Sequence, residues 1–310
     1  MSIKRGFKQV DRAADRLTGA RLKRELLPVY KESLDEIRGQ LGLLYEKYAR
    51  DGKLSYSEVQ KYNRLANLEK DIAEEINKLG ARVRPRIRKT VRDVYQESYY
   101  RTAFVVEKDV QARLRYGQLP KKQIEAALVS PFGWPDATQD SLKTLIRQVR
   151  SEITSGIIQG KAYPDVAQKV SERMGVAAKR AETIVRTEAH RVRELGKVES
   201  LEHACEQGVE MVKVWDAALD DRTRESHQEL DGQKVPVLDE SGEPGVFTNP
   251  ETGDTAQYPG NFGVASEDIN CRCSVRGEIK DMAPKVRRAR EEGTIPHQTY
   301  KEYAKDKGWK

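Results

Sequence analysis

The stretch AAKRAETIVRTEAHRVRELGKVESLEHACE, residues 177–206, carries the longest uninterrupted helical pattern of this 310-residue chain. Apolar side chains recur in it at three- and four-residue steps, the spacing that places them on one face of an α-helix. Outward from this stretch, the same spacing recurs at 22–48, 55–79, 85–106 and 142–157. Most of the chain before residue 206 is therefore predicted to form long helices.

Downstream of residue 206 the pattern changes to that of strands. Residues 209–215 show the β-branched alternation of a strand, and 269–275 form a second strand candidate. Asp231-Gly232 predicts a tight turn, and the Gly- and Pro-containing stretch 241–269 predicts a long loop. The predicted fold class is α+β and predominantly α, with long N-terminal helices followed by a smaller mixed helix and strand domain.

Helix-breaking residues predict where the chain divides. Gly80 is expected to end the 55–79 helix, and SPFGWP at 130–135 predicts a joint between domains. We predict a basic helical domain at 1–130, a mixed domain at 131–280, and a C-terminal tail with a short helix at 281–310.

Composition and cysteine usage exclude several classes of protein. The longest uncharged run, residues 255–266, has 12 residues, whereas a membrane-spanning helix needs about 20. The N-terminus lacks the apolar segment of a secretory signal. Cys205, Cys271 and Cys273 are too sparse, and odd in number, for a disulfide-stapled secreted domain. We expect a soluble protein of intracellular origin.

Charge is divided unevenly along the chain. Residues 1–150 hold 32 basic and 20 acidic side chains, and residues 151–310 hold 24 and 29. The positive first half indicates a polyanionic or acidic partner. Its densest segment suits non-specific contact with a nucleic-acid backbone, although a solvated helix surface has the same composition. The basic residues of this segment are Arg82, Arg84, Arg86, Arg88, Lys89 and Arg92.

Glu188 interrupts the apolar stripe of the 177–206 helix, three residues after Val185 and four before Val192. A carboxylate at that position must be paired or have a raised pKa. It is interpreted either as a buried ion pair with an arginine, which would tie the helix to the following sheet, or as a functional carboxylate.

Acids surround one histidine after the first predicted strand. Asp216, Asp220 and His227 could form a metal site or an acid–base pair. The same residues are also what a short helix beside a turn contains, with Asp220 or Asp221 as its cap. No nucleophile motif or phosphate-binding loop accompanies them, which favours a protein that is not an enzyme.

The segment Asn270-Cys271-Arg272-Cys273 adds two thiols. On a strand, residues two apart point to the same side, so both thiolates could bind one Zn²⁺ ion. His227 would supply a third ligand, and Cys205 or an aspartate a fourth. Without a metal, the two cysteines would be small core residues. A structural zinc ion is the one cofactor that the sequence raises.

These motifs in combination resemble a known family. Their order is R-T-E, then W-D, D-R-T-R, H and L-D-G, then N-C-R-C. It is similar to that of the tailed-phage head-morphogenesis proteins, the minor head proteins related to the F protein of phage Mu. The resemblance covers residues 140–280, and the aromatic end at 300–309 also resembles the family. The motif residues are Arg186, Glu188, Trp215, Asp216, Asp221, Arg222, Arg224, His227, Asp231, Gly232, Asn270, Cys271, Arg272 and Cys273.

The resemblance implies a structural role in the virion, inside the phage head, after assembly in the host cytoplasm. Such proteins contact the portal and assist head morphogenesis and the packaging or ejection of DNA. The implied partners are the portal protein, the major capsid or scaffolding protein, and packaged double-stranded DNA. The alternative hypothesis is a metal-dependent hydrolase or nuclease that uses Asp216, Asp220, His227 and the pair Cys271 and Cys273.

Overall fold

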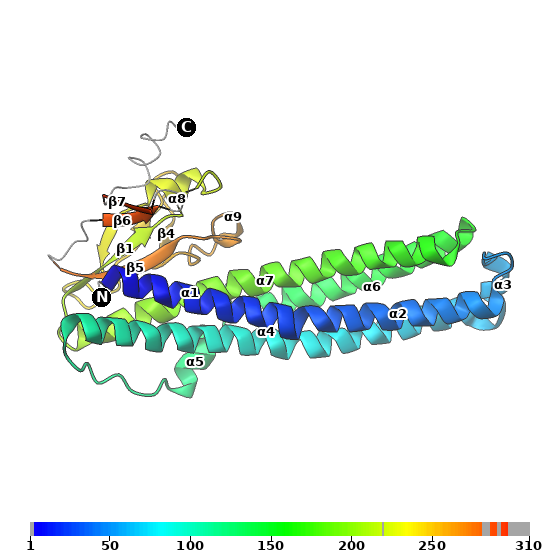
Figure 1. The fold of residues 1–310 in the computed structure, drawn as a ribbon, viewed down its shortest axis with the longest axis horizontal. Coiled ribbons are helices and arrows are strands. Elements are labelled where there is room, and N and C mark those ends of the chain that lie inside the picture. Colours follow the sequence, from blue (N-terminus) through cyan, green and yellow to red (C-terminus); the bar gives the residue numbers. More distant parts are fainter. Residues whose placement is uncertain (1–2, 219, 281–285, 290–292, 297–310) are drawn as a thin grey trace. The chain divides into compact units, whose positions relative to one another are not determined.

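The computed structural model describes residues 3–218, 220–280, 286–289 and 293–296 (Figure 1). Long helices occupy the chain as far as residue 206, and short strands follow. The predicted fold class is thereby confirmed. In chain order, the first part contains α1 (Ile3–Arg21), a π-helical segment (Leu22–Leu26), α2 (Leu27–Tyr48), α3 (Tyr56–Gln60), a 3₁₀ turn (Lys61–Asn63), α4 (Arg64–Val110), α5 (Lys121–Ala127), α6 (Trp134–Ile158) and α7 (Tyr163–Glu206).

The described residues group into two compact units, each assembled from segments that are distant in sequence. The first unit takes its residues from the ranges 1–18, 90–132 and 186–310, and the second from 19–89 and 133–185. Helices α1, α4 and α7 therefore each contribute residues to both units. The domain boundaries expected at 130/131 and 280/281 stay a prediction.

The second unit is helical. It consists of α2, α3, α6, the first part of α4 and the first part of α7. The apolar stripes predicted from the sequence form its core, because the side chains that define them are at most 1% exposed: Ile37, Leu41, Ile72, Ile76, Leu145, Val149 and Ile153.

Gly80 does not end a helix, so that prediction is wrong. Helix α4 continues through Gly80 and Pro85 for 47 residues. A Cβ atom at position 80 would lie 2.6 Å from Leu142 Cδ1 on α6, so the glycine allows close packing. Glycine inside a helix costs only about 1 kcal/mol relative to alanine, and the tertiary contact overrides the local signal.

Within the first unit, three strands form an antiparallel sheet in the order β2-β1-β5. Val214 of β1 pairs with Lys234 of β2 on one side and with Arg276 of β5 on the other. Figure 1 shows β1 and β5 beside the N-terminal part of α1. The strand bounds are β1 (Met211–Asp216), β2 (Lys234–Pro236) and β5 (Ser274–Ile279).

Strand β5 begins at Ser274, later than the predicted start at residue 269. The Asn270–Cys273 segment therefore precedes the strand. Asn270 has a left-handed φ of 59°, a conformation that asparagine tolerates better than most residues. The turn at this residue explains why the strand starts only after Cys273.

The long loop predicted at 241–269 contains short elements of its own. Strands β3 (Phe247–Thr248) and β4 (Thr255–Ala256) pair antiparallel, and α9 (Ala265–Asp268) follows. In the predicted tail, β6 (Val286–Ala289) pairs antiparallel with β7 (Gly293–Pro296). The predicted short helix and the aromatic residues at 300–309 lie outside the described residues.

Helices α4 and α7 approach each other closely in the first unit. A Cβ atom at Gly196 of α7 would lie 2.7 Å from the Tyr95 carbonyl oxygen and 3.2 Å from the Tyr99 nitrogen of α4. The lack of a side chain at Gly196 therefore allows the two helix backbones to approach closely. Of the helices in the described part of the chain, none is both long and apolar enough to cross a membrane.

Candidate functional site

Asp231 and Gly232 fix the chain segment that follows β1. The Asp231 carboxylate accepts a hydrogen bond from the Ala217 backbone N–H at 2.8 Å. The Gly232 N–H donates to the Trp215 carbonyl at 2.8 Å, and Gly232 has a φ of 79°, which glycine adopts without strain. The Leu-Asp-Gly motif thus closes the loop that carries the candidate acids and His227.

Asp220 and Arg272 form a bidentate ion pair between this loop and the segment before β5. Arg272 Nη2 donates to Asp220 Oδ1 at 2.7 Å, and Nη1 donates to Oδ2. The hydrogen bonds from Arg272 lower the pKa of Asp220 to about 2, against the opposing effect of burial. The Asp220 carboxylate is therefore ionised, and both of its oxygens accept hydrogen bonds from Arg272.

Short helix α8 (Glu225–Glu229) has Arg224 as its N-cap residue. The prediction that Asp220 or Asp221 caps this helix is therefore wrong. Arg224 donates from Nη2 to the Ile269 carbonyl at 2.6 Å, while Asp221 and Arg222 are exposed. The Asp220 carboxylate accepts hydrogen bonds from the Arg222 N–H at 3.1 Å and from Thr223 Oγ1 at 3.3 Å, so it holds the turn before α8 without capping the helix.

Asp216, at the end of β1, is paired with Arg276 of β5. Arg276 is 2% exposed and also contacts Glu278 through Nη2 at 2.6 Å. Asp216 and Asp220 are thus held by two different arginines. Among the described residues, neither aspartate belongs to the cluster of potential metal ligands that contains His227, so the acids expected for a hydrolase do not converge.

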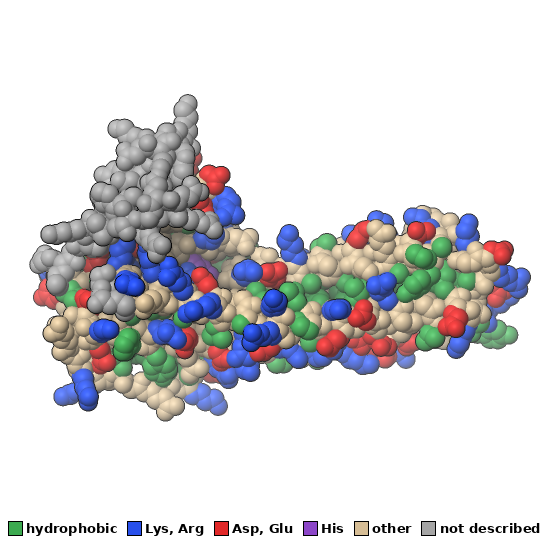
Figure 2. Space-filling view, in the orientation of Figure 1, with side chains coloured by type: hydrophobic (Ala, Val, Ile, Leu, Met, Phe, Trp, Pro, Cys, Tyr) green, Lys and Arg blue, Asp and Glu red, His purple; other side chains and the backbone are tan. Residues whose placement is uncertain are grey.

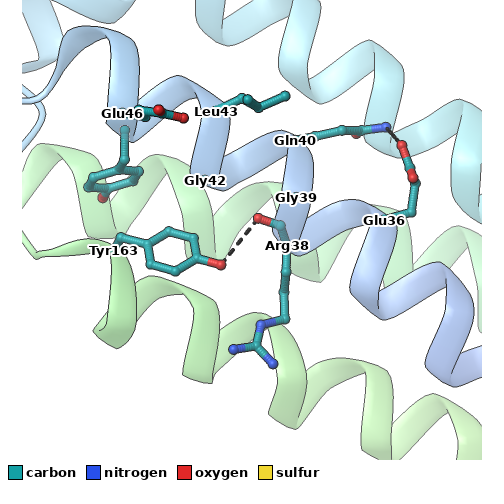
Figure 3. A pocket seen from close by; sticks show the side chains of 9 residues that line it. Glu36, Arg38, Gly39, Gln40, Gly42, Leu43, Glu46 and Tyr163 are labelled. Atoms are coloured by element: carbon teal, nitrogen blue, oxygen red, sulfur yellow. Dashed lines mark hydrogen bonds between the residues drawn. The ribbon is translucent and has the colours of Figure 1, made fainter.

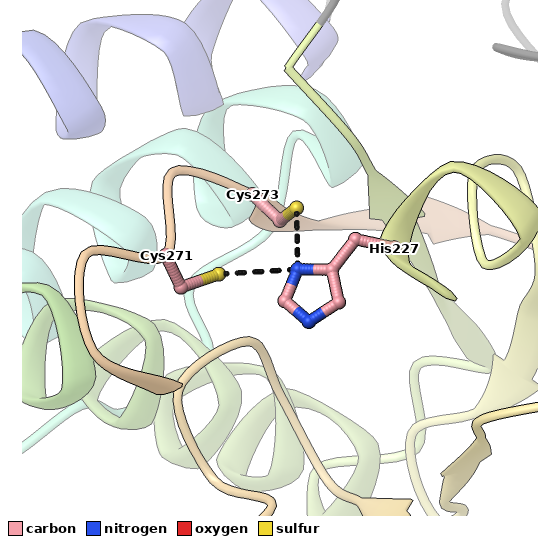
Figure 4. Close-up of side chains that lie close together, drawn as sticks. All are labelled: His227, Cys271 and Cys273. Carbon is pink, nitrogen blue, oxygen red and sulfur yellow. Dashed lines mark hydrogen bonds between the residues drawn. The ribbon is translucent and has the colours of Figure 1, made fainter. Parts of the chain in front are cut away.

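His227, Cys271 and Cys273 do come together (Figure 4). His227 Nδ1 lies 3.3 Å from Cys273 Sγ and 3.6 Å from Cys271 Sγ. On the other side of the ring, Nε2 lies 2.9 Å from a Glu267 carboxylate oxygen. The Trp215 ring packs edge-on against the imidazole at 5.5 Å.

The two cysteines reach the histidine by a route that differs from the predicted one. They lie on the segment before β5, so strand alternation does not align them. Both are nonetheless buried, at 6% and 1% exposure. Hydrogen bonding with Cys273 holds the pKa of Cys271 well below its usual range. Cys205, offered as a fourth ligand, lies in a different cluster, beside the core of Met211 and Val237.

Glu188 is in a buried ion pair, one of the two interpretations given above. Its carboxylate accepts hydrogen bonds from Ser130 Oγ at 2.6 Å and from Arg191 Nε at 3.0 Å. Arg191 Nη2 also donates to the Ala127 carbonyl at 2.9 Å. The pair therefore ties α7 to the 127–130 segment, and not to the sheet.

A second buried charge cluster on α7 was missed in the sequence. Lys197 Nζ lies 2.7 Å from Glu194 Oε2 and 2.8 Å from Asp11 Oδ1, and it donates to Ser274 Oγ at 2.8 Å. Burial opposes ionisation of Asp11, but Lys197 and Arg193 outweigh it and lower its pKa. The E-x-x-K spacing at 194 and 197 was the available signal, since it puts both charges on one helix face.

A pocket of about 490 Å³ adjoins the thiols in the first unit. Cys271 lines it, together with motif residue Arg186, which is exposed. His190 is buried there, and its Nδ1 lies 2.9 Å from Arg193 Nη2. The full lining is Ala14, Asp15, Thr18, Arg186, Ala189, His190, Arg193, Asn270, Cys271 and Arg272.

A further pocket, of about 660 Å³, lies on the second unit between α2 and the start of α7 (Figure 3). The Tyr163 hydroxyl donates to the Arg38 carbonyl at 3.2 Å across it. None of the nine described residues that line it is a cysteine or histidine. Among the usual zinc ligands, its lining therefore offers only the carboxylates of Glu36 and Glu46.

The basic segment on α4 is partly engaged with acids. Arg82, which is half-buried, contacts Glu75 at 3.0 Å and Glu32 at 3.1 Å. Half-buried Arg86 donates to the Arg82 carbonyl at 2.6 Å. Arg92 contacts Asp93 at 3.0 Å. The exposed members of the predicted nucleic-acid contact are Arg84, Arg88, Lys89 and Arg92.

Comparisons with known proteins place these features in a family context. A family model described as "Phage Mu protein F like protein" matches residues 147–276, which include every motif residue from Arg186 to Cys273. Minor head protein GP7 of Bacillus phage SPP1 is 32% identical over 285 residues, covering 91% of this chain and 90% of that protein. No solved structure matches this chain.

A second relative is a larger protein. NAD(+)--arginine ADP-ribosyltransferase EFV of Enterococcus faecalis (strain ATCC 700802 / V583) is 30% identical over 274 residues. The match covers 86% of this chain but only 53% of that protein. About half of the relative thus has no counterpart in the match.

Proposed function

Because this chain belongs to the phage Mu F-like family of head-morphogenesis proteins, we propose that it is a minor head protein of a tailed phage. Its role is structural and non-enzymatic, and its place is inside the virion head. The observation that carries this proposal is the similarity to Minor head protein GP7 along nearly the whole of both chains. Similarity of that extent supports a shared role more strongly than one shared segment would.

The first proposed partner of the protein is the portal protein. Three apolar side chains of the second unit support a protein-docking surface, since Leu43, Ile158 and Val176 are 56%, 62% and 64% exposed. Single exposed apolar residues are common, and comparable ones, Phe104 and Val129, lie on the first unit, so the support comes from the exposure of each side chain. The major capsid or scaffolding protein is the other candidate partner in the head.

Co-expression with the portal protein of the same phage, followed by co-purification at physiological salt, tests the docking. We expect a complex that Leu43→Ser/Ile158→Ser/Val176→Ser weakens. Val129→Ser removes an equally exposed apolar side chain, 73% exposed, from the first unit and should leave capture unchanged. Two folded proteins that do not co-purify would contradict portal docking.

Packaged double-stranded DNA is the second proposed partner, held non-specifically by exposed basic residues of α4. Arg84 and Arg88 are one helical turn apart, with Lys89 next to them. Figure 2 shows Lys and Arg side chains interspersed with Asp and Glu on the face in view. The proposed contact is the local group of Arg84, Arg88 and Lys89.

A salt series with the full-length protein and random duplexes tests DNA contact. Binding should weaken steeply as salt rises, since each neutralised phosphate adds about 0.9 to the slope of log affinity against log salt. Arg84→Gln/Arg88→Gln/Lys89→Gln should reduce that slope. The control replaces Lys70, Lys143 and Lys169, exposed lysines of the same unit that each lie beside an acid. Salt-independent binding, or an equal loss in the control, would reject the contact.

The separate pairing of Asp216 with Arg276 and of Asp220 with Arg272 supports a non-enzymatic role over the hydrolase alternative. A carboxylate locked in an ion pair is a poor general base for a reaction at His227. Incubation of the purified protein with DNA and divalent cations checks this. Cleavage that His227→Ala abolishes in a folded variant would reverse the ranking.

A further inference from the structure

We propose that His227 Nδ1, Cys271 Sγ and Cys273 Sγ bind one Zn²⁺ ion that holds α8 to the segment before β5. The inference does not depend on the proposed function. The three donor atoms lie within 4.8 Å of one another, and all three side chains are buried. Thiolate and imidazole are the donors that zinc prefers in proteins.

The distances between the donors fit a tetrahedral centre. Zinc bonds of about 2.3 Å to sulfur and 2.0–2.1 Å to nitrogen, at a tetrahedral angle, separate a sulfur from a nitrogen by about 3.6 Å. The observed separations from His227 Nδ1 are 3.3 Å to Cys273 and 3.6 Å to Cys271. Little movement of the ligands would be needed for the ion to bind.

Glu267 lies behind the histidine ring. Its carboxylate is 2.9 Å from His227 Nε2, at an angle that does not make a hydrogen bond, and its negative charge favours the tautomer with the proton on that nitrogen. Nδ1 then carries a free lone pair and points at both sulfurs (Figure 4). A carboxylate behind a histidine ligand is the usual outer partner of a zinc site, where it fixes the ring and its tautomer.

Two sulfurs face one imidazole lone pair, which can accept a full hydrogen bond from only one thiol. A metal ion shared by the three side chains accounts for both contacts to this nitrogen. The three protein ligands leave a fourth position, which a water molecule could occupy.

His190 supplies a donor next to the thiols. Arg193 can only donate, so the contact at 2.9 Å makes His190 Nδ1 an acceptor. The other ring nitrogen, Nε2, is buried. Such a donor beside the pocket wall formed by Cys271 would stabilise a thiolate there.

The ion would connect two parts of the chain that are distant in sequence. Helix α8 has five residues, and the elements between it and Cys271 are short: β2 has three residues, β3 and β4 have two each, and α9 has four. The ion would add to the contacts that already join these parts, the Asp220–Arg272 ion pair and the hydrogen bond from Arg224 to the Ile269 carbonyl. A metal that closes such a loop restricts the unfolded chain and stabilises the native one.

Metal analysis of the full-length protein tests the proposal. The protein is purified without a histidine tag, dialysed against a weak chelator and assayed for zinc per chain. We expect one equivalent, lost in Cys271→Ser, Cys273→Ser and His227→Ala but kept in Cys205→Ser, the matched control at the remaining cysteine. A strong chelator should lower the Tm of the wild type and of Cys205→Ser alone.

Cobalt substitution keeps the test decisive if a variant fails to fold. Co²⁺ added to the wild-type apoprotein should give thiolate-to-cobalt charge-transfer absorption that saturates at one equivalent and is reversed by zinc. A folded wild type that holds no stoichiometric zinc and gives no such absorption would overturn the proposal. Equal loss of zinc in Cys205→Ser would overturn the ligand assignment.

Discussion

The carboxylate of Glu194 on α7 accepts a hydrogen bond from the backbone N–H of Val275 on β5 at 2.7 Å. The same carboxylate lies 2.7 Å from Lys197 Nζ, and neither side chain is exposed. A buried ion pair thus connects a long helix to the edge strand of the sheet. Asp11 of α1 joins the pair through Lys197, so three elements meet at one lysine.

Lys197→Met should destabilise the protein by up to about 3 kcal/mol, because Glu194 and Asp11 would lose one of their two cations and keep only Arg193. Urea unfolding followed by circular dichroism measures the change. Lys169→Met is the control, since its ion pair with Glu172 is about half exposed on both sides and should contribute at most about 1 kcal/mol. Equal effects of the two substitutions would contradict the assigned role.

Gly196→Ala and Gly175→Ala, both on α7, should have opposite effects. The new methyl group at 196 would lie 2.7 Å from the Tyr95 carbonyl, and such overpacking costs about 1–3 kcal/mol. At 175 nothing lies within 4 Å, so the higher helix propensity of alanine should stabilise by about 0.5–1 kcal/mol. Thermal unfolding of both variants measures these effects. An unchanged Tm in Gly196→Ala would contradict the close approach of α4 and α7.

Glu267→Gln should weaken zinc binding about 10- to 100-fold without abolishing it, because the amide still contacts His227 but no longer fixes its tautomer. Competition with a chromophoric chelator gives the affinity. Glu229→Gln, an exposed change at the end of α8, is the matched control. Unchanged affinity in Glu267→Gln would show that the carboxylate is not part of the site.

Asp220 predicts a pH dependence of stability at the acid end. Its folded pKa of about 2 lies below the ordinary value of 3.8, so its pairing with Arg272 stabilises above about pH 4 and is lost as pH falls to 2. Arg272 is 37% exposed, which limits the contribution to about 1 kcal/mol. The stability gap between wild type and Asp220→Asn should close between pH 4 and 2, whereas Asp221→Asn, an exposed neighbour, should show no such change.

The helices were predictable because their apolar residues repeat with the helical period, as at Ile72 and Ile76. Their ends were less so. Gly80 breaks a helix by local propensity, but the approach of Leu142 makes glycine the residue that fits inside one. A local sequence pattern does not show which residue of the partner helix lies opposite Gly80.

The site was predicted in part. His227, Cys271 and Cys273 were chosen from their side-chain chemistry, and the structure brings them together, although the strand geometry used to justify the choice was wrong. Glu188 was expected to pair with an arginine and so to tie α7 to the sheet. It does pair with Arg191, but its second partner, Ser130, ties α7 to the 127–130 segment instead. Glu194 makes the contact to the sheet instead. Its burial depends on tertiary packing, which the sequence pattern does not show.

The two interleaved units have a consequence for how such a gene can be inherited. A recombination point anywhere between the codons for residues 90 and 185 would deliver incomplete portions of both units. Exchange between phage genomes should therefore preserve this coding region as one indivisible cassette. The two matches span 91% and 86% of the chain, the second within a protein about half of which lies outside the match.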